Sequence, residues 1–411
     1  MYRRAILLLY FCLCAGRVGL RAQEFKLFDR EVQIHGFASQ GFVHTNDNNW
    51  LTMNTSHVGS GEFTDFGLNA STQIRDNFRV GAQIFDRNLG KLGRWHPSLD
   101  WGGGDWRIKP WLGIRGGKVK TTLGLYTDSQ DLDFLRVFVL LPQSVYSTDV
   151  RDATIAHTGG DIYGTFRLTH DLGDLAYTAY AGHRNDSTYS GYPYIISQFQ
   201  VYFKTYGGLQ YGGDIRWNTP VKGLLAGISR LDEDISGKGS AINPFDPASG
   251  LYPFYEHSRA DWTNQYYGEY TAGKLRIDSE YRRYLRDEAF YLTSYNITDV
   301  RGWYISGAYP LSKRLALGSY YSRYTIVSII GGPVSALYPN QTDTSLPANH
   351  IYDKVISARF DLKKFWNVKA EGHFMNGNGD SIYPDGFYPQ QNPEGFKPNT
   401  NALVLKSSLY F

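Results

Sequence analysis

The stretch Asp65–Ile74, DFGLNASTQI, decides the fold class because its residues alternate between two faces at every step. One face carries Phe66, Leu68, Ala70, Thr72 and Ile74, and the other carries Asp65, Gly67, Asn69, Ser71 and Gln73. A period of two is the pattern of a β-strand with one apolar and one polar side. A polar turn at 75–77 follows, and the alternation resumes at Val80. The stretch therefore predicts a strand that leads into an antiparallel hairpin.

The same hairpin unit recurs to the end of the chain and predicts sixteen strands. We expect them at 32–45, 62–74, 78–87, 97–106, 111–121, 154–168, 174–184, 204–217, 223–230, 261–271, 275–286, 300–309, 315–326, 352–362, 368–375 and 400–411. Most are as long as the roughly 9–11 residues that a tilted strand needs to cross a bilayer. Their connections alternate between short turns, such as 75–77, and long loops, such as 122–153 and 231–260. This sorting is typical of a transmembrane β-barrel and has no reason to occur in a soluble sandwich.

Residues 1–22 have the pattern of a secretory signal peptide, with a basic start at Arg3-Arg4, an apolar segment and a cleavage site after Ala22. We therefore assign 23–411 to one barrel domain. Both cysteines, Cys12 and Cys14, lie inside the signal, so disulfide scaffolds are excluded. Removing the four arginines of the signal leaves 38 basic residues against 39 acidic ones. Such a balance does not indicate a nucleic-acid partner.

No apolar run after the signal approaches the roughly 18 residues of a transmembrane helix. Tryptophans and tyrosines gather near the ends of the expected strands, as in the interfacial girdles of membrane barrels. The last strand ends on Phe411, which resembles the C-terminal signal that outer-membrane barrels present to their assembly machinery. Together these features predict an all-β, antiparallel transmembrane barrel with long external loops and short periplasmic turns.

Several segments resemble bacterial outer-membrane porins: 32–42, 62–69, GGKVK at 116–120, LGLY at 123–126 and LLPQSVY at 140–146. The similarity is to sixteen-stranded, trimeric general or substrate-preferring porins, including phosphate- and dicarboxylate-type channels. It implies passive diffusion of small hydrophilic solutes or ions across the outer membrane of a Gram-negative bacterium. The implied partners are two further copies of the chain, outer-membrane lipid and lipopolysaccharide. The resemblance also implies that the third long loop, 122–153, folds into the lumen.

Charges on this loop and on the strands around it are the candidate site. The expected constriction residues are Lys118, Lys120, Asp128, Asp131, Asp133, Arg136, Arg151 and Asp152, and the expected wall residues are Arg115, Arg276, Glu280, Arg282, Arg286 and Arg359. Rings of charge set selectivity in channels. We hypothesise that the loop acids face the charged side of strand 275–286 and create a transverse field. The alternative is that these are ordinary solvated residues of the lumen.

The apolar patch 134–141 is interpreted as a short helix or an extended clamp that packs the loop on the inner wall; a track for apolar solutes is the other reading. No nucleophile elbow, zinc-binding His-Glu-x-x-His motif or phosphate-binding loop is present, so we expect no enzyme and no catalytic residues. No metal or other cofactor is expected. Two alternatives remain, a secreted soluble all-β carbohydrate-binding or adhesion protein and a gated or exporting outer-membrane barrel.

Overall fold

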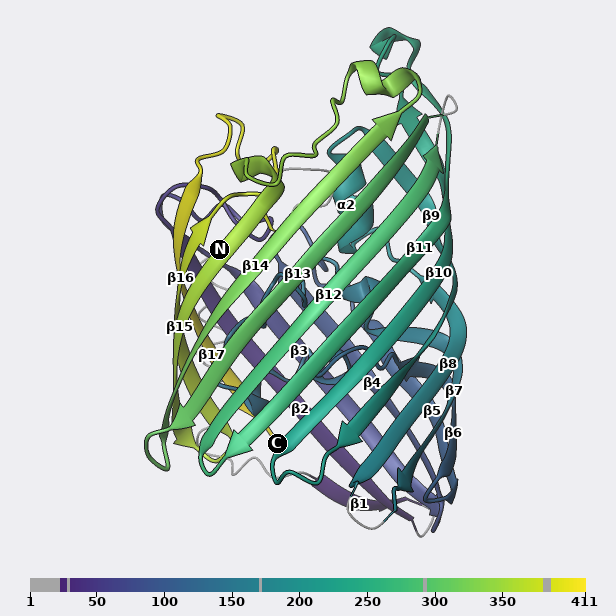
Figure 1. The fold of residues 1–411 in the computed structure, drawn as a ribbon, viewed down its shortest axis with the longest axis vertical. Coiled ribbons are helices and arrows are strands. Elements are labelled where there is room, and N and C mark those ends of the chain that lie inside the picture. The colour runs from purple at the N-terminus through teal and green to yellow at the C-terminus, as the bar shows by residue number, and fades with distance from the viewer. Residues whose placement is uncertain (1–22, 28–29, 170–171, 291–293, 380–385) are drawn as a thin grey trace.

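Sixteen antiparallel strands, β2–β17, close into a barrel in the computed structural model (Figure 1). The structure describes residues 23–411 except 28–29, 170–171, 291–293 and 380–385, so the expected signal peptide lies outside the described residues. The strands are β2 Arg30–Thr45, β3 Ser60–Arg75, β4 Phe78–Leu89, β5 Ser98–Lys109, β6 Leu112–Lys120, β7 Ala156–Arg167, β8 Asp174–Asn185, β9 Val201–Asn218, β10 Leu224–Ile242, β11 Leu251–Ala272, β12 Leu275–Phe290, β13 Ser294–Pro310, β14 Leu315–Gly331, β15 His350–Lys363, β16 Trp366–Asn376 and β17 Asn399–Tyr410.

The barrel closes where β17 pairs with β2, from Ala402 opposite Thr45 to Tyr410 opposite Phe37. Phe411 continues this edge, since its backbone exchanges hydrogen bonds of 3.0 and 3.1 Å with Gly36. A further strand that the sequence did not predict, β1 (Gln23–Leu27), pairs with residues 30–34 of β2. The predicted fold class and all sixteen predicted strands are confirmed.

The two sides of the wall have opposite polarity, which the period-two pattern requires. Outward residues such as Phe66, Leu68 and Ile356 leave 43%, 40% and 63% of their surface exposed. Inward residues such as Glu280 and Lys369 are buried. A soluble protein buries its apolar side chains and exposes its charges. The reverse arrangement suits a barrel surrounded by lipid.

Long and short connections lie at opposite ends of the barrel, as predicted. The seven short turns include 76–77, 110–111 and 364–365, whereas the third long loop, L3, comprises residues 121–155. The helices all lie in the long loops: η1 Thr127–Ser129, η2 Asp133–Leu135, η3 Arg151–Ala153, α2 Gly191–Ser197, η4 Pro247–Ser249, η5 Pro333–Ala336 and η6 Pro347–Asn349. None of the helices in the described part of the chain is long and apolar enough to cross a membrane.

Strands β10–β14 are longer than predicted and rise above the rest of the barrel on the long-loop side (Figure 1). β10 has 19 residues and β11 has 22, about twice the length that crosses a bilayer. The sequence had placed 231–260 in a loop. In the structure β10 and β11 stay paired to Ile242 opposite Leu251, with a register shift between Asp232 and Ser236.

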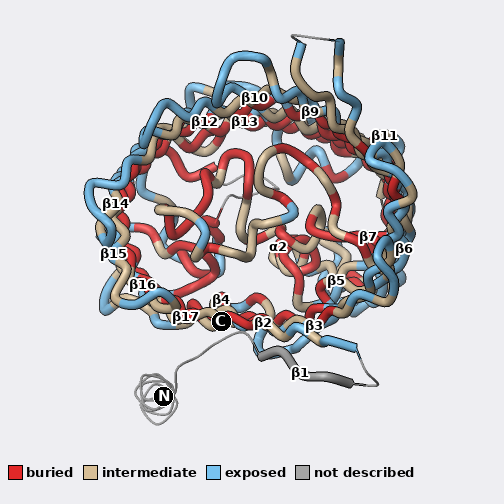
Figure 2. Tube along the Cα trace, turned by 90° about the horizontal axis from the view of Figure 1, so that it is seen from below, coloured by how far each residue is buried: buried red, intermediate tan, exposed pale blue. Residues whose placement is uncertain are grey.

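The lumen is not empty, because several long loops fold inward (Figure 2). Trp50, Leu51 and Met53 of the first loop form one buried cluster with L3 and with Phe387 of the last loop. The short helix α2 packs a second cluster against the inner faces of β9–β11. The interior is therefore narrowed by four loops, of which L3 crosses it most directly.

Candidate functional site

L3 crosses the lumen from β6 to the opposite wall. The backbone amides of Val139 and Leu140 donate to the carboxylate of Glu371 on β16, at 2.8 and 3.1 Å. The Tyr146 hydroxyl donates to Glu280 on β12 at 2.6 Å. Both strands belong to the wall opposite β6, so the loop is held where it reaches that wall. The resemblance to porins had implied this inward fold.

The first attachment point is the carboxylate of Asp133, in η2. Lys369 on β16 binds both this carboxylate, at 3.3 Å, and the carbonyl of Phe138, at 3.1 Å. Lys406 on β17 lies 3.8 Å from the same carboxylate, and Ser408 donates to it at 2.9 Å. Burial alone would raise the pKa of Asp133, but the two lysines outweigh it and hold the pKa well below its usual range. Asp133 is therefore a charged anchor of L3.

The apolar patch follows this anchor and packs on the wall. Phe138, Val139, Leu140 and Leu141 are buried, and the Phe138 ring meets that of Tyr320 edge-on at 5.2 Å. Arg359 on β15 donates to the carbonyl oxygens of Phe134 and, at 3.3 Å, of Arg136. The patch begins in the 3₁₀ helix η2 and continues through bends without regular secondary structure. Packing against the wall, rather than a track for apolar solutes, accounts for these contacts.

Two glycines allow L3 to lie this close to the wall. A Cβ on Gly124, which has a φ of +70°, would lie 1.9 Å from Gln265 Nε2 and 2.5 Å from Glu280 Oε2. On the wall itself, a Cβ on Gly302 would lie 1.9 Å from the Ser144 carbonyl oxygen. These three distances are far shorter than a van der Waals contact, so a larger residue at either glycine displaces the loop.

A balanced charge cluster lies at the β6 end of L3. Lys120 pairs with Asp100 at 2.6 Å and with Asp131 at 2.8 Å. Arg151 pairs with the same two carboxylates, at 2.6 Å for Asp100, and with Asp152 at 3.1 Å. Burial would raise the pKa of Asp131, yet Arg151 and Lys120 hold it below its usual range. Arg87 lies 3.7 Å from Asp152 and completes the group. We call its six members the L3 root cluster: Arg87, Lys120, Arg151, Asp100, Asp131 and Asp152.

The remaining predicted constriction residues occupy different places. Lys118 donates to the Leu99 carbonyl oxygen at 2.6 Å and lies within electrostatic reach of the L3 root cluster. Arg136 donates to the carbonyl oxygen of Gln130 at 2.7 Å and so folds back on L3 itself. Asp128 is exposed and lies within electrostatic reach of Arg216 on β9.

The charged side of β12 does not face the loop acids as hypothesised. Arg276 pairs with Glu269 at 2.7 Å and with Asp278 at 2.8 Å. Arg286 pairs with Glu256, Asp261 and Glu288, which are all strand residues. Glu280 accepts hydrogen bonds from Tyr146, Tyr304 and Gln265, and on β6 the predicted wall residue Arg115 pairs with Asp161 at 2.9 Å.

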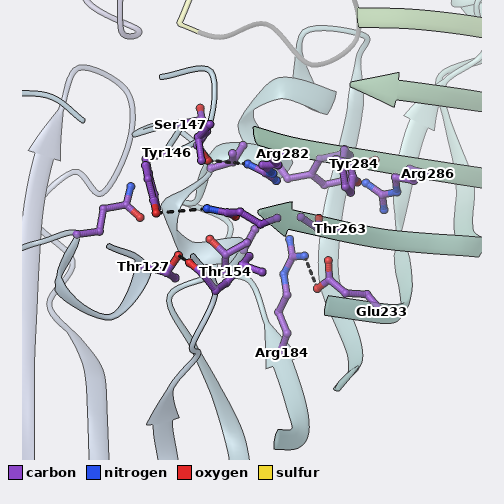
Figure 3. A pocket seen from close by; sticks show the side chains of 17 residues that line it. Thr127, Tyr146, Ser147, Thr154, Arg184, Glu233, Thr263, Arg282, Tyr284 and Arg286 are labelled. Carbon is purple, nitrogen blue, oxygen red and sulfur yellow. Dashed lines mark hydrogen bonds and ion pairs between the residues drawn. The ribbon is translucent and has the colours of Figure 1, made fainter. Parts of the chain in front are cut away.

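Arg282 differs from its neighbours on β12. Its Nη1 donates to the Val145 carbonyl oxygen at 2.9 Å, and its guanidinium lies 5.7 Å from the Tyr284 ring centre. Its Nε is buried without a hydrogen bond, and no ion pair to Arg282 occurs among the described residues. Figure 3 shows this side chain pointing into a cavity beside L3. Arg282 therefore presents a positive charge that the described carboxylates do not neutralise by contact.

L3 separates two cavities in the lumen. One, of about 70 Å³ and open to solvent, is lined by Tyr146, Arg282 and the Arg184–Glu233 ion pair (Figure 3). The other, of about 50 Å³, is lined by parts of the L3 root cluster and by Lys406. Gln130 borders both. Each cavity is lined by both basic and acidic side chains, and this lining suits polar solutes.

Several residues of this site were not predicted. Asp100, Arg87 and Glu371 pair with L3 or hold its backbone, and Arg184 forms a buried ion pair beside the first cavity. Glu371 does alternate with apolar residues on the predicted strand 368–375, so its inward direction was readable. Its partners on L3 were not, because they depend on the path of a loop more than 200 residues away.

The structure resembles solved outer-membrane barrels over nearly the whole chain. An anion-selective porin from Comamonas acidovorans matches with a TM-score of 0.52 at 8% identity, covering 93% of this chain and 100% of the other. The outer-membrane channel DcaP of Acinetobacter baumannii matches with a TM-score of 0.52 at 10% identity, covering 94% and 99%. The fold is that of a bacterial porin.

A third match is the trimer form of OmpT, an outer membrane protein of Vibrio cholerae. Its TM-score is 0.53 at 11% identity, and the match covers 92% of this chain and 99% of that protein. No protein-family model and no curated protein matches the chain. At these identities the similarity confirms the resemblance to porins at the level of the fold.

Proposed function

We propose that the protein is an outer-membrane porin, a water-filled channel through which small hydrophilic solutes or ions diffuse passively. The observation that carries this proposal is L3, which starts at β6 and is held by β12 and β16 on the opposite wall of a sixteen-stranded barrel with an apolar outer face. A loop that narrows an aqueous passage sets which solutes pass, and polar groups along it replace part of their hydration.

Location and assembly follow from the same proposal. The outward apolar side chains suit the outer membrane of a Gram-negative bacterium, with lipid and lipopolysaccharide as neighbours. The pairing of Phe411 with Gly36 at the closing seam supports recognition of the last strand by the assembly machinery. A homotrimer is proposed because the trimer form of OmpT has this fold. We propose no catalytic role.

Selectivity in this proposal is weak. The L3 root cluster contains as many basic as acidic side chains: Arg87, Lys120 and Arg151 against Asp100, Asp131 and Asp152. Paired charges create only short-range fields, so neither ion sign is strongly rejected. The unpaired Arg282 favours anions on its side of L3.

Conductance in planar bilayers tests the proposal directly. The purified full-length protein should give step-wise current increases at once, with the larger steps of a trimer resolving into three levels. A protein that stays in the aqueous phase without detergent would indicate the soluble carbohydrate-binding or adhesion alternative. A detergent-extracted barrel that inserts but carries almost no current would favour the gated or exporting alternative instead.

A further inference from the structure

The elongated strands β10–β14 (Figure 1) line a third cavity, an apolar one, on the long-loop side of the barrel. Its volume is about 110 Å³, it opens to solvent, and eleven of its fourteen lining residues are apolar or aromatic. All fourteen lie in segments that the sequence had assigned to loops. The strand extensions therefore create a small apolar cavity that the sequence did not predict.

Aromatic side chains from distant segments form the walls of this cavity. Phe254 comes from β11 and Phe290 from β12, while Phe199 follows α2. The Phe199 ring meets that of Tyr338, which follows η5, edge-on at 5.7 Å, and this contact joins two long loops above the strands. The walls therefore suit a flat or branched apolar group, which binds through its buried surface.

The floor of the cavity is acidic. Glu256 and Glu288 line it, and each is only 3% exposed. The Tyr192 hydroxyl donates to Glu256 at 2.7 Å and to Glu288 at 3.2 Å. Arg286 pairs with both carboxylates, at 3.3 and 3.0 Å, and with Asp261 at 3.4 Å. We call Glu256, Glu288, Asp261 and Arg286 the floor cluster.

The floor cluster holds three carboxyl groups and one guanidinium. Burial and the neighbouring Glu288 carboxylate raise the pKa of Glu256 to about 8, so a proton neutralises this group near pH 7. An organic cation that reaches Glu256 and Glu288 takes the place of that proton, and the aromatic walls add cation–π attraction.

We propose that this cavity is an external binding site for amphipathic organic cations, with the ammonium against Glu256 and Glu288 and the apolar body between Phe254, Phe290 and Tyr338. Tyr192 and Arg286 also line the lumenal cavity beside L3. The floor cluster thus separates the apolar cavity from the cavity that Arg282 lines beside L3. A cation bound here lies at the external entrance to the proposed channel, but its binding does not depend on conduction.

Calorimetric titration of the full-length protein in a non-ionic detergent tests the site. The probe is the (3-phenylpropyl)trimethylammonium ion, with empty micelles as the blank. We expect saturable one-to-one binding. Binding of 4-phenylbutyrate, which has a similar body and the opposite charge, should be at least roughly tenfold weaker, and so should binding of tetramethylammonium, which lacks the body.

Two substitutions separate charge from apolar contact. Glu256→Gln keeps the shape and removes the carboxyl group that can ionise, and Phe254→Ala removes a wall; each should weaken cation binding by roughly tenfold or more. Glu394→Gln, on an exposed glutamate of the last loop, is the matched control and should bind as the wild type does. Unchanged cation affinity in Glu256→Gln, or equal affinity for the anion, would overturn the proposal. Conductance measured on the same preparation decides the porin function separately.

Discussion

Replacing Lys369 by methionine tests whether the Asp133 anchor holds L3 across the lumen. The lysine side chain is fully buried and binds the Asp133 carboxylate as well as the carbonyl oxygens of Asp133 and Phe138. Removing one partner of a buried ion pair costs about 3–5 kcal/mol. Lys406 and Ser408 still reach the carboxylate, so we expect the lower end of this range. About 3 kcal/mol corresponds to a roughly 100-fold larger undocked population of η2.

Single-channel recording in planar bilayers measures this change. The Lys369→Met channel should show transient steps to a higher conductance at least roughly ten times as often as the wild type, because an undocked η2 widens the passage. Lys364→Met, in the exposed turn between β15 and β16, is the matched control and should leave the recordings unchanged. Heat-modifiable migration on gels verifies that both barrels are closed. Wild-type recordings from a folded Lys369→Met barrel would refute the role of this anchor.

Three further predictions concern other parts of L3 and the wall. Arg282→Glu should move the reversal potential toward cation preference, whereas Arg314→Glu in an exposed turn should not; equal reversal potentials would rule out Arg282 as a selectivity group. Burial raises the pKa of Asp149 to about 6, although the hydrogen bond from Tyr388 favours its ionised form. The closed state, in which Asp149 is buried against the last loop, should therefore gain up to about 3 kcal/mol as the pH falls from above 6 to about 4. Current fluctuations should therefore decrease on acidification, and this pH dependence should vanish in Asp149→Asn. Gly302→Val should push Ser144 from the wall and change the size cutoff in liposome swelling, while an unaltered cutoff would show that L3 adapts without moving.

The sequence predicted the strands well because alternation is local and is repeated along each strand. On β12 it assigned Glu280 and Arg282 to the lumen, and both line it. It missed the extension of β10, where Asp232-Glu-Asp234 and the glycines at 237 and 239 interrupt the pattern. There the pairing with β11 shifts register once and then continues, so the strand extends to Ile242. Tertiary pairing overrode the local signal.

The alternation of residues along a strand could not predict which side chains pair across the lumen. The sequence placed Asp131 and Asp133 on L3 and expected arginines of β12 to face them. The structure pairs Asp131 with Lys120 and Arg151, which flank the loop, and Asp133 with lysines of β16 and β17. These pairs follow from where the loop crosses the barrel, and a strand pattern contains no information on that path. Arg286 had nearer acids on its own and the adjacent strand.

This pairing changes which charges can govern a passing ion. A side chain that already holds L3 through two or three short contacts, as Arg151 does, has little freedom to bind a solute, and its field is largely cancelled by its partners. Counting the charges of the lumen therefore overstates its selectivity. The groups that remain effective are those for which the described residues provide no ion pair, such as Arg282 beside one cavity and the exposed Asp128 near the start of L3. These two groups have opposite signs and lie in different places. We therefore expect the channel to discriminate between solutes by the positions of the charges within the solute more than by its net charge.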